Sequence, residues 1–186
     1  WRTTAQNYNL NRDFMKADAP EMQAWLRLFN RWLPDLLVDC HVTDGADYQY
    51  AVTYGIAKDH SVSEPLQKWI TEVFEPYLNE KMKNDGFPMF PYIWFKQRPD
   101  IQKGLVSFIG SPRYSTGYGA IQNRIFFLIE THMLKDYKTR VTATYHLLKR
   151  VIELCNKEKD TLKQVNQLAD KQTKAELAGS SFPLSL

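Results

Sequence analysis

The chain has 186 residues, of which 44% are hydrophobic and 24% are charged, a composition that suits one α/β domain with a substantial core. The formal net charge of +3 comes from scattered basic residues and does not indicate nucleic-acid binding, and no apolar run approaches the roughly 18 residues of a transmembrane helix. The two cysteines, Cys40 and Cys155, lack the spacing of a disulfide framework or a zinc knuckle.

The first predicted helix lies in "DAPEMQAWLRLFNRWLP", with Asp18 as its expected N-cap and Pro34 at its end. Residues 36–40 predict a strand buried on both faces, and residues 48–54 predict another. Residues 63–84 have the apolar period of an amphipathic helix. The strands "YIWFK" and "GLVSFIG" follow, and then the predicted loop "SPRYSTGYGA" leads into the apolar strand "IFFLIE".

From about Lys138 a very long helical pattern begins, and its second half is polar. These elements predict an α/β fold in which a mixed, mostly parallel sheet is flanked by helices, with a long C-terminal helix. We assign residues 1–150 to the C-terminal part of a catalytic domain and residues 151–186 to a long helix and a linker towards a following domain. The final "SSFPLSL" has the pattern of the start of a further strand.

The chain begins at Trp1 rather than at a Met. We therefore expect a piece of a longer protein, so that the lack of a targeting signal carries no information. Cutting a sheet domain exposes strand edges and apolar surface, which predicts that the isolated chain self-associates.

Polar residues that the fold does not require occur at four places. His41 ends the strand "LLVDCH", although an isolated histidine there is more often structural. Glu130 ends the apolar run "IFFLIE", where a carboxylate is costly to bury unless it is paired, bound to metal or used in catalysis. The other two places are the segment "NYNLNRDF" and the loop "SPRYSTGYG", and each is ordinary on its own.

In this order, "NLNRDF", "PDLLVDCH", a tyrosine-containing loop and an apolar strand ending in Glu resemble the zinc carboxypeptidase family, the carboxypeptidase A-like metallopeptidases. That family has an Asn-Arg pair, a strand ending in the third zinc-ligand histidine, a tyrosine loop and a catalytic glutamate. The "WR" at Trp1-Arg2 resembles the arginine that the family has upstream of the Asn-Arg pair. The resemblance covers about residues 1–150.

The resemblance implies a role for each candidate residue. His41 would be a zinc ligand, and Glu130 would take a proton from the attacking water and later protonate the leaving amine. Arg2 would stabilise the oxyanion. The remaining candidates would bind substrate: Asn11 and Arg12 at its C-terminal carboxylate, and Tyr114 or Tyr118 closing over it. These side chains should therefore converge on one concave surface.

The sequence also departs from the family pattern. The family's first two zinc ligands come from an upstream His-x-x-Glu motif, which none of the four histidines here supplies. We therefore expect zinc as the cofactor of the intact protein, with two ligands outside this chain, and an inactive fragment. Asn9 stands where the family has an Asp that orients a ligand histidine. The stretch from Tyr114 to Glu130 is also shorter than in the digestive enzymes.

The leading interpretation is thus a fragment of a metallocarboxypeptidase, a hydrolase whose intact parent cleaves a C-terminal peptide bond or an amide bond to an amino acid. Its partner would be a peptide or amino-acid conjugate with a free C-terminal carboxylate, rather than nucleic acid or a membrane. The resemblance also favours a secreted or periplasmic location. The alternative is a non-catalytic module on the same scaffold that binds peptide C-termini through Asn11 and Arg12.

Overall fold

The structure is a computed structural model, and it describes residues 2–44, 46–97, 100–107 and 110–178. Trp1, residues 108–109 of the predicted strand "GLVSFIG", and the tail "SSFPLSL" lie outside this set. No helix within the described part is both long enough and apolar enough to cross a membrane.

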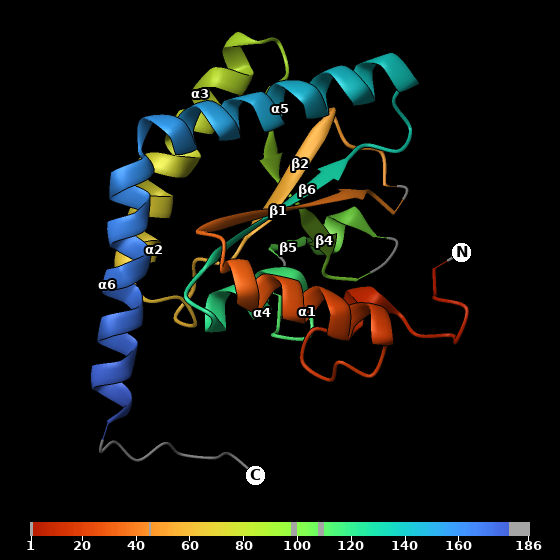
Figure 1. Cartoon of the computed structure of the whole chain (residues 1–186). Coiled ribbons are helices and arrows are strands. Elements are labelled where there is room, and N and C mark those ends of the chain that lie inside the picture. The colour runs from red at the N-terminus through yellow and green to blue at the C-terminus, as the bar shows by residue number, and fades with distance from the viewer. Residues whose placement is uncertain (1, 45, 98–99, 108–109, 179–186) are drawn as a thin grey trace.

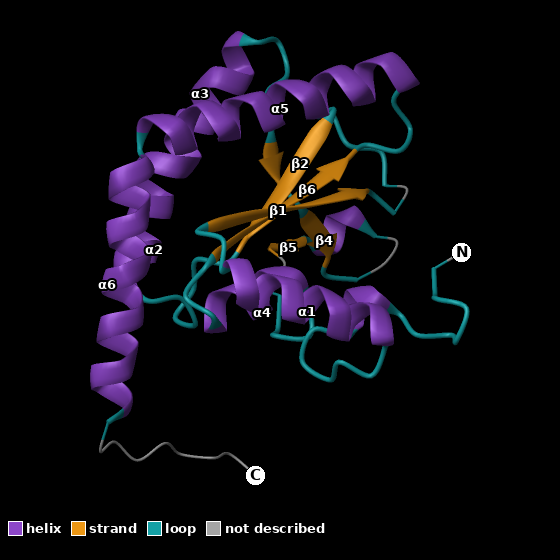
Figure 2. Ribbon diagram, viewed as in Figure 1, coloured by secondary structure: helices purple, strands orange, loops and turns teal. Residues whose placement is uncertain are grey.

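The central sheet contains four strands in the order β1-β6-β2-β3 (Figures 1 and 2). Their bounds are β1 (Leu36–Val42), β6 (Ile125–Thr131), β2 (Val52–Ile56) and β3 (Phe90–Pro91). β1 pairs in parallel with β6, β2 pairs in parallel with β3, and β2 and β6 run antiparallel. The predicted mixed, mostly parallel sheet flanked by helices is confirmed.

β6 is the innermost strand of the fold, since all seven of its residues are buried. Its side chains alternate between two apolar layers, as strand geometry requires. Phe127 packs in the larger core cluster, and Phe126 packs in a smaller one with Phe29 and Tyr118. This explains why "IFFLIE" is apolar throughout: both faces of the strand are covered.

Helices cover the two faces of the sheet. The larger cluster joins the sheet to α5 (Tyr137–Lys157) and to the predicted helix over residues 63–84. That helix comprises α2 (Glu64–Trp69), the π-helical turn η2 (Ile70–Phe74) and α3 (Glu75–Asn84). On the opposite face lie α1 (Pro20–Trp32) and α4 (Ser115–Ile121). A separate two-stranded antiparallel ribbon consists of β4 (Ile93–Phe95) and β5 (Leu105–Ser107). The described chain also contains the 3-10 turns η1 (Leu10–Arg12) and η3 (Ile101–Lys103).

The structure corrects the sequence-based description of β1. The strand was expected to be buried on both faces, but it lies at the edge of the sheet and none of its residues is fully buried. Leu36 and Val38 pack against the larger core cluster and Leu37 packs against the smaller one on the opposite face, whereas no described strand pairs with the outer edge of β1. A run such as "LLVDC" therefore indicates apolar contacts on two faces, but it does not show whether the strand lies in the middle or at the edge of the sheet.

The start of α1 also differs from the prediction. Ala19, not Asp18, is the N-cap residue, and no side chain caps the helix from that position. The Asp13 carboxylate instead accepts hydrogen bonds from the backbone amides of Asp18 and Ala19, at 3.1 and 2.9 Å. A carboxylate six residues before the N-cap residue thus fixes the turn into the helix, and local capping patterns do not detect such a distant partner.

The predicted loop over residues 111–120 contains α4 instead. Gly117 permits this helix to lie directly against the backbone of Gly110 and Ser111, because a Cβ at position 117 would come within 2.1 Å of the Gly110 carbonyl oxygen. Gly119 similarly lies against the ring of Phe126. The glycines that favoured a loop in the sequence are therefore there for close packing.

The long C-terminal helical pattern is two helices rather than one. α5 ends at Lys157, Glu158 leaves the helical conformation, and α6 (Lys159–Leu177) continues in a different direction (Figure 1). The physical reason is tertiary: α5 packs over the sheet and α3, whereas α6 packs against α2. No Gly or Pro marks this break in the sequence.

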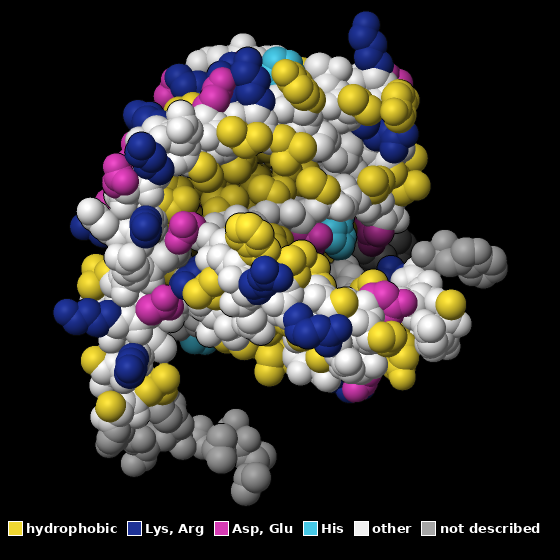
Figure 3. Space-filling model, viewed as in Figure 1, with side chains coloured by type: hydrophobic (Ala, Val, Ile, Leu, Met, Phe, Trp, Pro, Cys, Tyr) yellow, Lys and Arg dark blue, Asp and Glu magenta, His cyan; other side chains and the backbone are white. Residues whose placement is uncertain are grey.

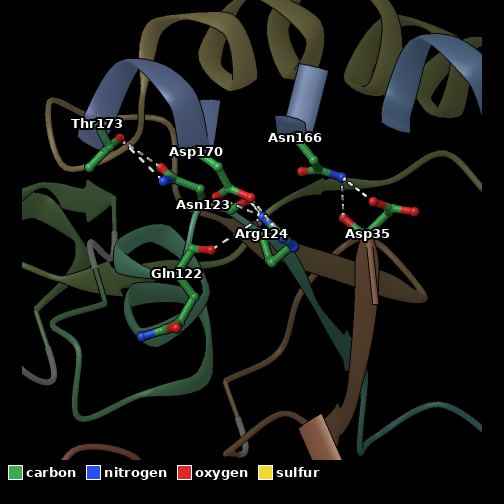
Figure 4. Close-up of polar contacts among 7 residues, drawn as sticks. All are labelled: Asp35, Gln122, Asn123, Arg124, Asn166, Asp170 and Thr173. Atoms are coloured by element: carbon green, nitrogen blue, oxygen red, sulfur yellow. Dashed lines mark hydrogen bonds and ion pairs between the residues drawn. The ribbon is translucent and has the colours of Figure 1, made fainter. Parts of the chain in front are cut away.

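Polar side chains hold α6 against the start of the sheet (Figure 4). The buried guanidinium of Arg124 forms a two-pronged pair with Asp170, at 3.1 and 3.0 Å. Asn166, also buried, donates to the backbone and side-chain oxygens of Asp35 just before β1. These contacts attach α6 to the loop before β1 and to the residue immediately before β6.

Candidate active site

A cavity of about 150 Å³ opens at the ends of β1 and β6, beside the N-terminal segment. Its lining includes the five candidates with a predicted catalytic, ligating or carboxylate-binding role, namely Arg2, Asn11, Arg12, His41 and Glu130. It also includes four residues to which no role had been assigned, namely Asp44, Tyr92, Trp94 and Ser115. Tyr114 lines it as well. The structure thus brings together residues that lie up to 128 positions apart in the sequence.

The sheet register explains why His41 and Glu130 meet. In the parallel pairing of β1 with β6, these two residues are direct partners, so their side chains leave the sheet on the same face. The His41 Nδ1 atom lies 3.9 Å from Glu130 Oε1. His41 and Glu130 are each the last residue but one of their strands, so the two strands bring an imidazole and a carboxylate to one point.

Glu130 occupies an environment that disfavours its charge. Its side chain is 9% exposed, and its Oε2 atom is buried without a hydrogen-bond partner in the structure. Burial raises the pKa of Glu130 to about 7; nearby His41 opposes this rise, and the negative charges of Asp39 and Asp44 add to it. A carboxylate with such a pKa can both accept and donate a proton near neutral pH.

His41 is held by a residue that the sequence analysis missed. Its Nε2 atom lies 3.0 Å from Asp39 Oδ1, and this hydrogen bond raises the pKa of His41 despite the opposing effect of burial. Asp39 in turn accepts a hydrogen bond of 2.6 Å from Ser115 Oγ. Burial alone would raise the pKa of Asp39, but the hydrogen bonds from His41 and Ser115 lower it. The sequence did contain the information needed to predict that Asp39 lies beside His41, because residues two apart on a strand share a face.

The cationic side of the cavity comes from the N-terminal segment. The Arg12 guanidinium lies over the Tyr114 ring, 4.1 Å from its centroid, and burial lowers the pKa of Arg12. Asn11 and Arg12 belong to the η1 turn, which orients both towards the cavity. Asn9 precedes this turn as its N-cap and accepts a hydrogen bond from the Arg12 amide, and it is not among the cavity-lining residues.

The two candidate tyrosines occupy different environments. Tyr114 lines the cavity, immediately before α4. Tyr118 is only 8% exposed and packs among Phe14, Trp25, Phe29 and Phe126. The structure therefore does not place Tyr118 where it could contact a substrate in this cavity, because it belongs to the smaller core cluster.

The described residues do not complete a zinc site on their own. Among residues 2–44, 46–97, 100–107 and 110–178, no group of three His, Cys, Asp or Glu side chains could hold a metal ion. A catalytic zinc takes three protein ligands, and this cavity supplies one imidazole beside a carboxylate suited to act as a base. His41 alone fits the part of a single ligand.

The environment of Glu130 predicts a pH-dependent stability. Because its pKa rises from 4.5 in the unfolded chain to about 7 in the folded one, the folded state binds more protons between these values. The free energy of unfolding should therefore fall as pH rises from about 4.5 to 7. We expect Glu130→Gln to exceed the wild type in stability at pH 8 by about 1–3 kcal/mol, and the gain to vanish near pH 4.

Urea denaturation of the metal-free chain across this pH range measures the effect. Glu72→Gln, at an exposed position on η2, is the matched control and should follow the wild type at every pH. A Glu130→Gln variant that is equally or less stable at pH 8 would show that the carboxylate is not buried at a cost.

Comparison with known proteins supports the fold. No protein-family model matches the sequence, and no curated protein matches it either. Among solved structures, the chain is similar to a metallo-carboxypeptidase from Pseudomonas aeruginosa in complex with (2-guanidinoethylmercapto)succinic acid, with a TM-score of 0.59 and 18% sequence identity. The match covers 87% of this chain and 42% of that enzyme, so the chain spans less than half of its length. The likeness shows a carboxypeptidase-like fold.

Proposed function

We propose that this chain is part of a zinc-dependent metallocarboxypeptidase that removes a C-terminal amino acid from a peptide or an amino-acid amide. The observation that carries the proposal is the pairing of His41 with Glu130 in a cavity whose other side presents Arg2 and Arg12. A carboxypeptidase needs a ligand imidazole, a base and a cationic group for the substrate carboxylate, and the carboxypeptidase-like fold is consistent with this assignment.

In this proposal, His41 supplies one zinc ligand, and polypeptide beyond the present sequence supplies two more. When bound, zinc would lower the pKa of a coordinated water and polarise the scissile carbonyl. The chain's own residues provide the remaining functions. Glu130 takes a proton from the attacking water and later gives it to the leaving amine.

The cationic side of the cavity would bind and stabilise negative charge. Arg12 and the Asn11 amide hold the terminal carboxylate of the substrate, because a guanidinium matches the two oxygens of a carboxylate. Arg2 donates to the oxyanion that forms at the scissile carbonyl. Tyr114, whose ring already contacts Arg12, lies over this carboxylate site.

The experiment uses the longer gene product that contains this chain, incubated with peptides and assayed for release of the C-terminal amino acid. We expect release that a chelator abolishes and zinc restores, and no release by the 186-residue chain alone. If the longer product releases nothing while still binding peptides with free carboxylates, the non-catalytic module described above replaces the enzyme.

We also propose that the isolated chain self-associates along the exposed edge of β1. Figure 3 shows a hollow with an apolar floor between α5 and α1, the elements that flank β1. On α5, Val141, Tyr145 and Ile152 are 49%, 62% and 68% exposed, and an apolar pocket lies between α1 and β1. Light scattering should give a mass above the 21.8 kDa of one chain, and a monomer at high concentration would contradict the proposal.

A further inference from the structure

The two ring nitrogens of His41 face different partners. Nε2 is within hydrogen-bond distance of Asp39 Oδ1, at 3.0 Å, whereas Nδ1 is 3.9 Å from Glu130 Oε1, which is too long for a hydrogen bond. A neutral imidazole carries one N–H, and the stronger acceptor decides which nitrogen bears it. The geometry therefore places the proton on Nε2 and leaves the Nδ1 lone pair directed to the cavity side.

Asp39 is itself fixed by the fold. It precedes His41 by two residues on β1, so both side chains lie on the same face of the strand. Its second oxygen, Oδ2, accepts the hydrogen bond from Ser115, which is 3% exposed. Ser115 is the first residue of α4, and the tight packing of Gly117 on the backbone of Gly110 and Ser111 sets where that helix begins.

We propose that Asp39, supported by Ser115, is a positioning residue that fixes the tautomer and orientation of His41 and so presents Nδ1 for metal binding. The metal-binding part of this inference rests on the proposed function, whereas the tautomer follows from the described contacts alone. Asp39 would not touch substrate or metal. It would act only through the imidazole, as carboxylates commonly do for metal-ligating histidines.

Ser115 also connects the His41 site with the Tyr114 side of the cavity. Tyr114 is the N-cap residue of α4 and contacts Arg12 through its ring, while the next residue holds Asp39. One short segment thus fixes both the group proposed to lie over the substrate carboxylate and the support of the proposed metal ligand. A shift of this segment would disturb both sides of the cavity together.

The test is the tautomeric state of His41 in the metal-free 186-residue chain, read from long-range ¹H–¹⁵N correlation spectra at a pH high enough for a neutral ring. The wild type should show Nε2–H. Asp39→Ala removes the acceptor at Nε2, so Glu130 becomes the carboxylate nearest the ring, and we expect the ratio of Nδ1–H to Nε2–H to rise about 10- to 100-fold, as the loss of a charge-assisted hydrogen bond implies.

Asp39→Asn is the conservative variant, since its amide oxygen can still accept from Nε2–H, and it should keep the wild-type tautomer. The buried His132 lies outside this cavity and serves as the internal control, because its signals should not change if the variants fold. Nδ1–H in the wild type, or an unchanged tautomer ratio in Asp39→Ala with intact His132 signals, would overturn the proposal.

This outcome is distinguishable from failure of the proposed function. The tautomer is read without metal and without substrate, so it does not depend on hydrolysis. A longer gene product that releases no amino acid would remove the enzymatic role and leave the Asp39–His41 pairing intact. An active product whose His41 tautomer ignores Asp39 would remove the positioning role alone.

Discussion

Replacing Glu130 by Gln in the longer gene product should lower kcat by about 10²–10⁴-fold, the usual contribution of general acid–base catalysis, with a much smaller change in KM. The amide keeps the size and the hydrogen-bonding capacity of the side chain but cannot take a proton from the attacking water. Steady-state kinetics on a peptide with a free C-terminus measures both parameters.

The control for Glu130→Gln is again Glu72→Gln, which removes the same charge at an exposed site on another element and should keep the wild-type kcat. The pH profile adds an independent reading. Bound zinc should lower the pKa of Glu130 below the value of about 7 that burial gives it in the metal-free chain, so the acidic limb of kcat/KM in the wild type should lie below pH 7. Wild-type kcat in Glu130→Gln would exclude Glu130 as the base.

Replacing Arg12 by Ala should act mainly on substrate binding. Losing the partner of a terminal carboxylate should raise KM by about 10- to 100-fold, which is the expected effect of removing a hydrogen bond to a charged group. Discrimination against peptides with amidated C-termini should shrink at the same time, because the variant no longer recognises the charge that the amide lacks.

Arg113→Ala is the matched control for Arg12→Ala. Arg113 also approaches the Tyr114 ring, at 5.8 Å, but it is exposed and does not line the cavity. The same change of charge there should leave the preference for free C-termini intact. If Arg113→Ala weakens that preference as much as Arg12→Ala does, general electrostatics rather than a specific contact explains it.

The sequence predicted the layered fold because its strongest patterns are local and periodic. The continuous apolar run of β6 and the amphipathic stripe over residues 63–84 each indicate one type of element, and the structure confirms both. The errors concern tertiary context. Neither the edge position of β1 nor the direction change at Glu158 follows from local residue preference, since each depends on what packs nearby.

The candidate site likewise contains residues that the sequence predicted and residues that only the structure identified. The order of motifs brought His41, Glu130, Arg2 and Arg12 forward as candidates, and the structure places them at one cavity. Asp39 and Ser115 lie within the quoted motifs, but no role was expected for either, and Ser115 reaches Asp39 only through packing between residues 76 positions apart. The two tyrosines could be separated only once α4 was seen to bury Tyr118.

The most direct measurement is a crystal structure of the longer gene product with zinc, with the metal located by its anomalous scattering. The account predicts a zinc peak about 2.1 Å from His41 Nδ1, with Glu130 beside the open coordination position and Asp39 still on Nε2. An active, zinc-loaded protein whose metal lies away from His41, or is bound through Nε2, would contradict it.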